Sequence, residues 1–312
     1  MRVLRLADTQ SRQFVEANVP QPQPGPGQVL VRVADAGVTR TEPLWYPTTH
    51  TRSGARREGP ILSHEFCGVI AAVGEGVRDF TIGQSVFGMN DWFEDGALAE
   101  YVLTYAHSVA PSPTTLTSAE AATVPVSALT AWQGLFYRGH LHPGDRVLIH
   151  GGAGGVGLFA VQIAHMHGAH VIATAAPRNF DFIRRLGASE VIDSRGEPFE
   201  KQITQPVDIV FDTIGGDMLT RSLPLIKPGR FAVTITSDHE NSSDPRVKEA
   251  FFLVEPHQRQ LMEIAAMIDM TRLKTFVDAI VPFDHAAEAY FGSPANRLGH
   301  GKLVVAVDPS IR

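Results

Sequence analysis

The spacing of apolar residues changes near residue 118 of this chain. Before that point, short apolar runs alternate with turns that contain glycine. Such runs predict strands, and several of them close together predict a compact, barrel-like β domain over residues 1–117. The runs fall at residues 29–37, 68–73, 80–88 and 97–104.

After residue 118 the pattern alternates between strand-like and helix-like segments. Ser118 stands where a helix N-cap is expected, and helix-forming residues follow it to residue 136. Strands alternating with helices predict an α/β fold with a doubly wound parallel sheet. The predicted strands are residues 145–150, 170–175, 190–194, 207–212 and 229–235, with helices at 154–168, 179–188, 218–226 and 256–269.

The last strand-like segment, residues 302–308, has no helical segment after it. We therefore expect this strand to return to the β domain, which is then built from both ends of the chain. The predicted organisation is a first β part over residues 1–117, a Rossmann dinucleotide-binding domain over 118–272, and a returning β part over 273–312.

The composition narrows the class of protein. Of the 312 residues, 44% are hydrophobic and 19% are charged, which is typical of a globular protein. The net charge of −6 argues against nucleic acid or an anionic membrane as a partner. We recognise neither a signal peptide nor an apolar segment long enough to span a bilayer. The single cysteine excludes an internal disulfide and a four-cysteine zinc lobe, and it fits a cytoplasmic location.

A glycine-rich loop follows the predicted strand 145–150 and opens the predicted helix 154–168. In it, Gly152, Gly154 and Gly157 have the spacing G-x-G-x-x-G. Glycines there permit a tight turn and let the backbone approach a pyrophosphate, which the helix N-terminus attracts. The sequence therefore predicts that this loop binds a dinucleotide. Its residues are Gly152, Ala153, Gly154, Gly155, Val156 and Gly157.

The residues after the next strand indicate which dinucleotide is bound. An NAD site carries an acidic residue at the end of that strand, where it binds the ribose 2′-hydroxyl. Here Thr174 stands near that position, no acidic residue is close to it, and Arg178 follows. Because a guanidinium suits a 2′-phosphate, the sequence predicts NADPH as the cofactor.

A series of motifs, in order along nearly the whole chain, resembles the medium-chain dehydrogenase/reductase superfamily. They include GPGQVLVRVADAGV, GPILSHEFCGVIAAVGEGV, the HGGAGGVG loop, LGASEVID and the terminal GKLVVAV. Within the superfamily the chain is similar to the zinc-independent quinone oxidoreductases, the branch that includes zeta-crystallin. The resemblance implies a GroES-like catalytic domain, a Rossmann domain, a nicotinamide cofactor and a homodimer. An apolar edge strand at residues 229–235 would suit such pairing.

The resemblance also implies contacts on the nicotinamide side of a cleft. They would come from a threonine in the motif ALTAWQ, a turn after a strand, an apolar tripeptide and the closing Gly-Lys motif. The residues concerned are Thr130, Ile214, Phe252, Leu253, Val254, Gly301 and Lys302. Two positions depart from the branch, which often has a tyrosine at Ser194 and an asparagine near Thr39.

The segment GPILSHEFCGVI places His64, Glu65 and Cys67 within four residues, a cluster of the kind that can ligate a transition metal. In the zinc alcohol dehydrogenases that the chain resembles, a first cysteine ligand precedes this segment, where the present chain has Thr39. Catalytic zinc needs three protein ligands, and a lone cysteine is usually a small buried residue. We therefore predict that no metal is bound.

Without a metal to polarise the acceptor, hydride transfer suits quinones and α,β-unsaturated carbonyls, which spread negative charge by conjugation. The predicted function is an NADPH-dependent, zinc-independent quinone or enone reductase, with Tyr46 as a candidate proton donor. A zinc alcohol dehydrogenase and a non-catalytic NADPH-binding protein with a structural or sensing role are the alternatives. The substrate depends on loops 40–60 and 237–256, whose shapes the sequence does not give.

Overall fold

The computed structural model describes residues 1–8, 12–237 and 244–311. The chain forms two compact units, which we call unit 1 (Met1–Val126 with Glu255–Arg312) and unit 2 (Ser127–Val254). Unit 2 is shorter at both ends than the predicted span 118–272. The reason is that α2 (Ser118–Ala121) packs on β3 and β4, and α9 (Gln258–Asp269) packs on β7, all in unit 1.

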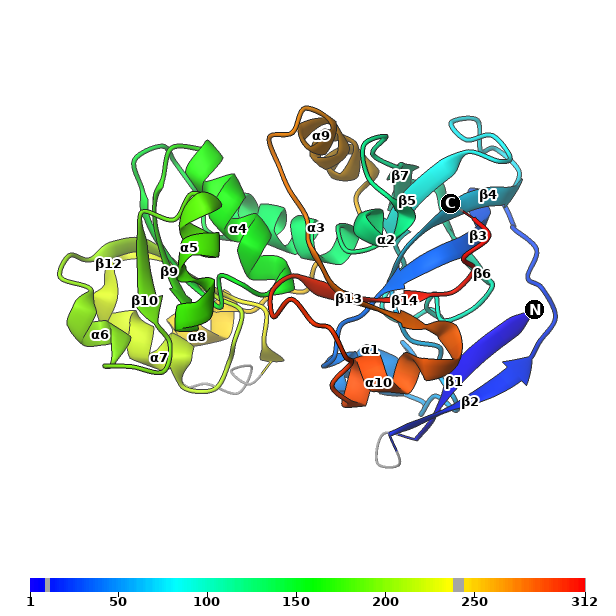
Figure 1. The fold of residues 1–312 in the computed structure, drawn as a ribbon, viewed down its shortest axis with the longest axis horizontal. Coiled ribbons are helices and arrows are strands. Elements are labelled where there is room, and N and C mark those ends of the chain that lie inside the picture. The colour runs from blue at the N-terminus through cyan, green and yellow to red at the C-terminus, as the bar shows by residue number, and fades with distance from the viewer. Residues whose placement is uncertain (9–11, 238–243, 312) are drawn as a thin grey trace. The chain divides into compact units, whose positions relative to one another are not determined.

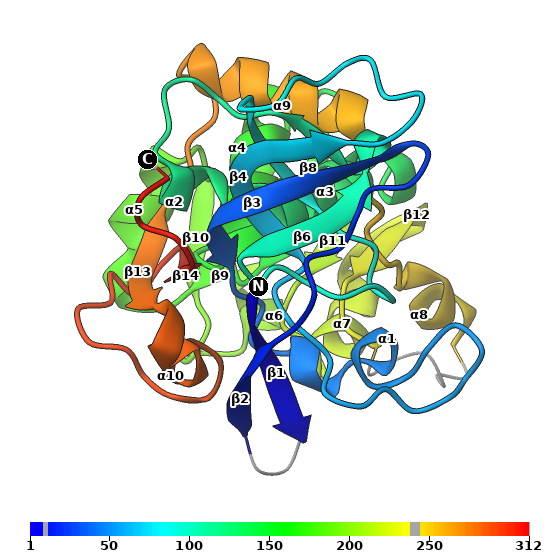
Figure 2. The same cartoon turned by 90° about the vertical axis from the view of Figure 1, so that its right-hand side faces the viewer.

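Unit 1 is built around a seven-stranded sheet, whose central strand β3 (Gln28–Gly37) has buried residues on both faces. β3 pairs antiparallel with β4 (Glu65–Val73), β6 (Tyr101–Tyr105) and β14 (Lys302–Ala306), and Figure 2 shows β3, β4 and β6 side by side. The pairing of β14 with β3 confirms that the last strand returns to the β domain.

The other elements of unit 1 complete the sheet or connect its strands. β5 (Ser85–Met89) and β7 (Val109–Pro111) extend it on the β4 side, and β13 (Val277–Pro282) pairs parallel with β14. The remaining elements are the hairpin β1 (Arg2–Asp8) and β2 (Gln13–Asn18), the short helices η1 (Glu42–Leu44), α1 (Tyr46–Thr49), η2 (Ala106–Ser108) and η7 (Phe283–His285), and α10 (Ala286–Phe291).

Unit 2 contains a five-stranded parallel sheet in the order β10-β9-β8-β11-β12. This is the doubly wound sheet that the sequence predicts, and Figure 1 shows its strands between covering helices. The strands are β8 (Arg146–His150), β9 (His170–Ala175), β10 (Glu190–Asp193), β11 (Val207–Asp212) and β12 (Ile226–Thr234). The helices are α4 (Gly155–Met166), η4 (Pro177–Asn179), α5 (Phe180–Arg185), α6 (Phe199–Gln202), α7 (Met218–Ser222), η5 (Leu223–Leu225) and α8 (Pro245–Ala250).

The predicted helix 118–136 differs from the observed structure in two respects. Its N-cap is Thr117 rather than Ser118, because Thr117 and Glu120 form a reciprocal capping box. The helix is also divided, since α3 (Pro125–Gln133) begins at a proline and continues as a π-helical turn, η3 (Gly134–Arg138). Among the described residues, no helix combines the length and the apolar character that crossing a membrane requires.

Candidate functional site

The glycine loop lies at the carboxyl end of β8, as predicted. Gly151 has φ of +78°, a conformation that favours glycine, and it turns the chain from β8 toward α4. Gly154 is the N-cap of α4, a helix of 12 residues. Because the first amides of a helix have no acceptor within it, those of α4 are available to an anionic ligand.

Close packing fixes the shape of this loop. A Cβ atom on Gly157 would lie 2.1 Å from the carbonyl oxygen of Gly151, so even an alanine would force the backbone to move. A Cβ atom on Gly154 would lie 3.4 Å from the same oxygen, an ordinary contact. Gly157 therefore serves the packing of helix against turn, and the loop retains the open backbone that a pyrophosphate requires.

The strand order of the sheet reverses between β8 and β11, and in such sheets ligands bind outside the carboxyl ends of the strands at this point. The glycine loop and the turn after β11 meet there. A Cβ atom on Gly151 would lie 2.6 Å from Thr213 Oγ1 and 2.7 Å from Ile214 Cδ1. Ile214, a predicted nicotinamide contact, is 58% exposed, so its side chain is open to a ligand on this edge.

Thr174 and Arg178, the two residues from which NADPH is predicted, lie in different surroundings. Thr174 is buried, and its Oγ1 accepts a hydrogen bond from the amide of Gly151 at 3.2 Å. Arg178 is exposed in η4, with no ion pair to any described residue. Ala176 is the first residue after β9 that is not buried. An acidic residue selecting NADH would therefore belong at Ala176 rather than at Thr174.

The other predicted cofactor residues of unit 2 lie on two elements. Thr130 is buried in α3. Phe252 is buried against η3, since a Cβ atom on Gly134 would lie 3.1 Å from its ring, and the guanidinium of Arg138 lies 5.8 Å from the ring centroid. Leu253 is partly exposed, and Val254 is buried. The structure thus brings Ile214 to the glycine loop and places Phe252 with η3.

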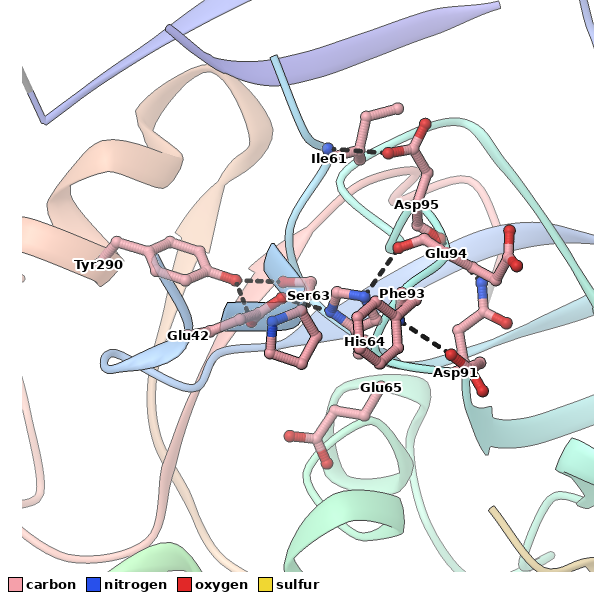
Figure 3. A network of polar contacts seen from close by, with 12 residues as sticks. Glu42, Ile61, Ser63, His64, Glu65, Asp91, Phe93, Glu94, Asp95 and Tyr290 are labelled. Carbon is pink, nitrogen blue, oxygen red and sulfur yellow. Dashed lines mark hydrogen bonds and ion pairs between the residues drawn. The ribbon is translucent and has the colours of Figure 1, made fainter. Parts of the chain in front are cut away.

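In unit 1, His64 belongs to a buried polar network (Figure 3). Its Nδ1 lies 2.5 Å from Glu42 Oε1, and its Nε2 lies 2.9 Å from the carbonyl oxygen of Glu94. The hydroxyl of Tyr290 donates to the other oxygen of Glu42 at 3.2 Å, and it contacts Ser63 Oγ at 2.9 Å. Because all four side chains are buried, this network forms part of the interior of unit 1.

The partners of His64 determine what its ring can bind. A carbonyl oxygen only accepts hydrogen bonds, so Nε2 carries a proton. One further proton lies between Nδ1 and Glu42, whichever of the two atoms holds it. Neither nitrogen then has a free lone pair for a metal ion. Among the described residues, no group of three or more His, Cys, Asp and Glu side chains could hold a metal ion.

Glu65 and Cys67 are also poorly suited to bind a metal ion. Figure 3 shows the Glu65 side chain pointing away from His64. Its carboxylate pairs with the ammonium group of Lys302 and accepts a hydrogen bond from the amide of Val126 at 3.0 Å. Burial raises the pKa of Glu65, and Lys302 opposes this shift. Burial also raises the pKa of the Cys67 thiol to about 12, so this thiol stays protonated at neutral pH. Lys302, a predicted cofactor contact, therefore has its charge balanced within unit 1, and Gly301 precedes it with φ of +87°.

Tyr46, the candidate proton donor, lies at the start of α1 and is 57% exposed. Its ring stacks on that of His50, with centroids 4.4 Å apart. The stacking restricts the ring, and the exposure leaves the phenol open to a ligand. Of the nearby arginines, Arg52 pairs with Asp91 and Arg57 pairs with Asp95, so these two charges are balanced locally.

Sequence reasoning missed the buried partners in both units. In unit 1 these are Glu42, Ser63 and Tyr290, which are far apart in sequence and carry no local pattern. In unit 2 they are His150 and Asp212, each fully buried at the carboxyl end of an apolar strand. The sequence did carry a signal for His150 and Asp212, because a polar residue that ends an apolar strand just before glycines often organises the following turn.

His150 gives a testable pH dependence. Burial, with a contribution from Arg221, lowers its pKa to about 4, although Asp212 and Glu200 oppose this shift. Between pH 6.5 and pH 4 the unfolded chain therefore binds a proton at His150 that the folded chain does not bind. The contribution of neutral His150 to the free energy of unfolding is therefore complete above pH 6.5. It is lost as the pH falls to about 4, and the free energy of unfolding decreases by on the order of 3 kcal/mol.

We expect the wild type to lose stability relative to His150→Gln as the pH falls from 7 to 4. Thermal unfolding of both proteins across this range measures the difference. Parallel pH profiles would show that His150 does not titrate in this way.

Comparison with known proteins assigns this chain to a family of dehydrogenases and reductases. The profile of the family "Alcohol dehydrogenase GroES-like domain" matches residues 25–114, and that of "Zinc-binding dehydrogenase" matches residues 186–305. Mitochondrial NAD(P)H oxidoreductase RTN4IP1 of Danio rerio is 31% identical over 281 residues, which cover 79% of this chain and 72% of that protein. Further relatives are polyketide synthases, of whose length this chain spans only 10% to 13%.

Solved structures agree with this grouping. The quinone oxidoreductase from Coxiella burnetii superposes with a TM-score of 0.85 at 26% identity, covering 99% of both chains. The CurK enoyl reductase superposes with a TM-score of 0.81 at 27% identity, covering 98% of both chains. A GroES-like unit with a Rossmann unit and its glycine loop defines an oxidoreductase that uses a nicotinamide cofactor. The chain belongs to the medium-chain dehydrogenase/reductase superfamily.

Proposed function

We propose that this protein is an NADPH-dependent reductase of quinones or α,β-unsaturated carbonyls that works without zinc. The observation that carries the proposal is the arrangement around His64, both of whose nitrogens are engaged by Glu42 and Glu94. The relatives named above include a quinone oxidoreductase and an enoyl reductase, in keeping with this substrate class.

The cofactor would be held by residues of unit 2. The first-turn amides of α4 would bind its pyrophosphate, and Arg178 would bind the 2′-phosphate through two N–H groups. Ile214, Leu253 and Thr130 are the candidates for the nicotinamide side. When bound, the dinucleotide supplies the hydride, and the protein orients both reactants and excludes water.

The proposal assigns no chemistry to a metal. Thr39 stands where the zinc enzymes that the chain resembles carry a cysteine, His64 has no free lone pair, and Glu65 is neutralised by Lys302. The matching profile named for zinc-binding dehydrogenases covers residues 186–305, which include none of Thr39, His64 and Glu65, so its name does not bear on this point. Without a metal, the hydride acceptor itself must delocalise the negative charge that develops on it.

After hydride transfer to such an acceptor, a proton must reach the enolate or phenolate oxygen or the adjacent carbon. Tyr46 is our candidate donor, because its phenol is exposed while its ring is restrained against His50. Loop 40–60, which carries Tyr46, also bears the exposed Leu44. Of the other predicted substrate loop, residues 238–243 lie outside the described residues.

Cofactor selectivity tests the proposal directly. We expect NADPH to bind about ten- to a hundredfold more tightly than NADH, because a charge-assisted hydrogen bond contributes about 1.5–3 kcal/mol. Arg178→Ala should remove most of this difference and leave NADH affinity nearly unchanged. Ala176→Asp should shift the preference toward NADH, because a carboxylate repels the 2′-phosphate. Fluorescence titration of the wild type and of both variants with each cofactor measures these affinities.

Arg184→Ala is the matched control, since Arg184 is an exposed arginine of α5 that pairs with Asp181. It should retain the wild-type preference. Equal affinities of the wild type for NADPH and NADH, or a strong NADPH preference in Arg178→Ala, would refute the assignment of Arg178.

We also propose a homodimer. β12 is an edge strand of the unit 2 sheet, and a second copy can extend an edge of this kind across a twofold axis. Sedimentation at micromolar concentration should give twice the chain mass, and a monomer across ordinary salt concentrations would contradict the pairing.

A further inference from the structure

Four buried polar residues form a row across the sheet of unit 2. Thr174 of β9 pairs in register with His150 of β8, His150 with Asp212 of β11, and Asp212 with Thr234 of β12. Each is at most 1% exposed. We call these four residues the polar row. Because each stands at or next to the last position of its strand, the row lies under the loops at the carboxyl edge of the sheet.

The hydrogen bonds of His150 define its protonation state. Ser222 donates its hydroxyl proton to the carbonyl oxygen of Met218 at 2.7 Å, so at its 2.8 Å contact with His150 Nε2 it must accept. Nε2 therefore carries the proton. Thr174 already accepts from the amide of Gly151, which leaves its own proton free for His150 Nδ1 at 3.3 Å. The ring is thus the neutral Nε2–H tautomer.

This ordering gives one continuous chain of donors. The chain runs from the amide of Gly151 through Thr174, His150 and Ser222 to the carbonyl oxygen of Met218 in α7. It joins the start of the glycine loop, directly after β8, to α7, which follows β11 in the sequence. A break at any member leaves a buried polar group without a partner, which costs more than the bond itself contributes.

The other half of the row holds the turn that carries Ile214. Asp212 Oδ1 accepts from the amides of Ile214 and Gly215 at 2.9 and 3.2 Å, and its Oδ2 accepts from the hydroxyl of Thr234 at 3.1 Å. Thr213 Oγ1 donates to the carbonyl oxygen of His150 at 2.7 Å. The two loops that flank the strand-order reversal are therefore anchored to the same row.

We infer that the polar row is a positioning device for the cofactor loops, in which Thr174 and His150 set the glycine loop before the dinucleotide arrives. The inference rests on the proposed function, because it takes the ligand of these loops to be a dinucleotide. Thr174 and His150 are positioning residues that act through the backbone of Gly151. They are not specificity residues that touch the ribose.

Thr174→Val and Thr174→Ser form a matched pair for the test. Valine has the shape of threonine without the hydroxyl, whereas serine keeps the hydroxyl. We expect the NADPH dissociation constant to rise about tenfold in Thr174→Val and to stay within about twofold of the wild type in Thr174→Ser. Without ligand, hydrogen exchange at the amide of Gly151 should accelerate in Thr174→Val alone. A residue with only a structural role would lower the unfolding temperature without changing affinity in the folded protein, and that result would overturn the inference.

The tautomer of His150 gives a readout that needs no cofactor. Nitrogen NMR of the free protein, assigned by comparison with His150→Gln, should show an unprotonated Nδ1 and a protonated Nε2 at neutral pH. The opposite tautomer, or an imidazolium, would overturn the inference. If the free protein behaves as expected but binds neither NADPH nor NADH, the proposed function fails while the positioning of the loop stands.

Discussion

Replacement of Lys302 by methionine should destabilise unit 1 by about 3–5 kcal/mol, because it leaves the carboxylate of Glu65 buried without its charge partner. Lys302 and Glu65 are both buried, and the Glu65 carboxylate also accepts a hydrogen bond from the amide of Val126. Calorimetry should show the unfolding midpoint of unit 1 lowered by roughly 10 °C.

The double variant Glu65→Gln/Lys302→Met is the control. Glutamine carries no charge and can still accept from Val126, so most of the lost stability should return. A Lys302→Met protein as stable as the wild type would show that the ion pair does not hold β4 to β14. Failure of the double variant to recover would indicate that packing, rather than charge, explains the loss.

Gly157→Ala should weaken the binding of NADPH and NADH at least about a hundredfold. The added Cβ atom would lie 2.1 Å from the carbonyl oxygen of Gly151, and neither atom can rotate away, because the backbone fixes the position of both. The loop must open, and the first-turn amides of α4 then lose their common direction. Isothermal titration with both cofactors measures the loss.

Gly154→Ala is the control variant, because it adds a Cβ atom to the same loop without a clash inside the protein. Its Cβ atom meets only an ordinary contact of 3.4 Å, so the variant should unfold at the wild-type temperature, whereas Gly157→Ala should unfold earlier. Wild-type affinity in Gly157→Ala would contradict the role of this glycine in shaping the loop.

Several features could be predicted from the sequence because each has a local cause. The alternation of strands and helices in unit 2 follows from apolar spacing, and the glycine loop from residues within one turn. The return of β14 could be predicted because a final apolar strand without a following helix has no place in a doubly wound sheet. The superfamily then followed from ordered motifs, and the comparisons confirm it.

Other features depend on contacts that no local pattern encodes. The direction of Thr174 is set by the amide of Gly151, which lies on a neighbouring strand end, so a count along the chain did not reveal that this side chain is buried. Glu42 contacts His64, and Tyr290, which lies 248 residues after Glu42, donates to the same carboxylate.

The most direct test of the proposed reductase is the rate of NADPH oxidation, followed by its absorbance, with a panel of simple quinones and enones in the presence of a strong chelator. The account predicts turnover of at least one such acceptor, faster with NADPH than with NADH at equal subsaturating concentrations, and unchanged by prior removal of metal. Activity that disappears with the metal and returns with zinc, or the absence of turnover with every acceptor in a protein that binds NADPH, would contradict it.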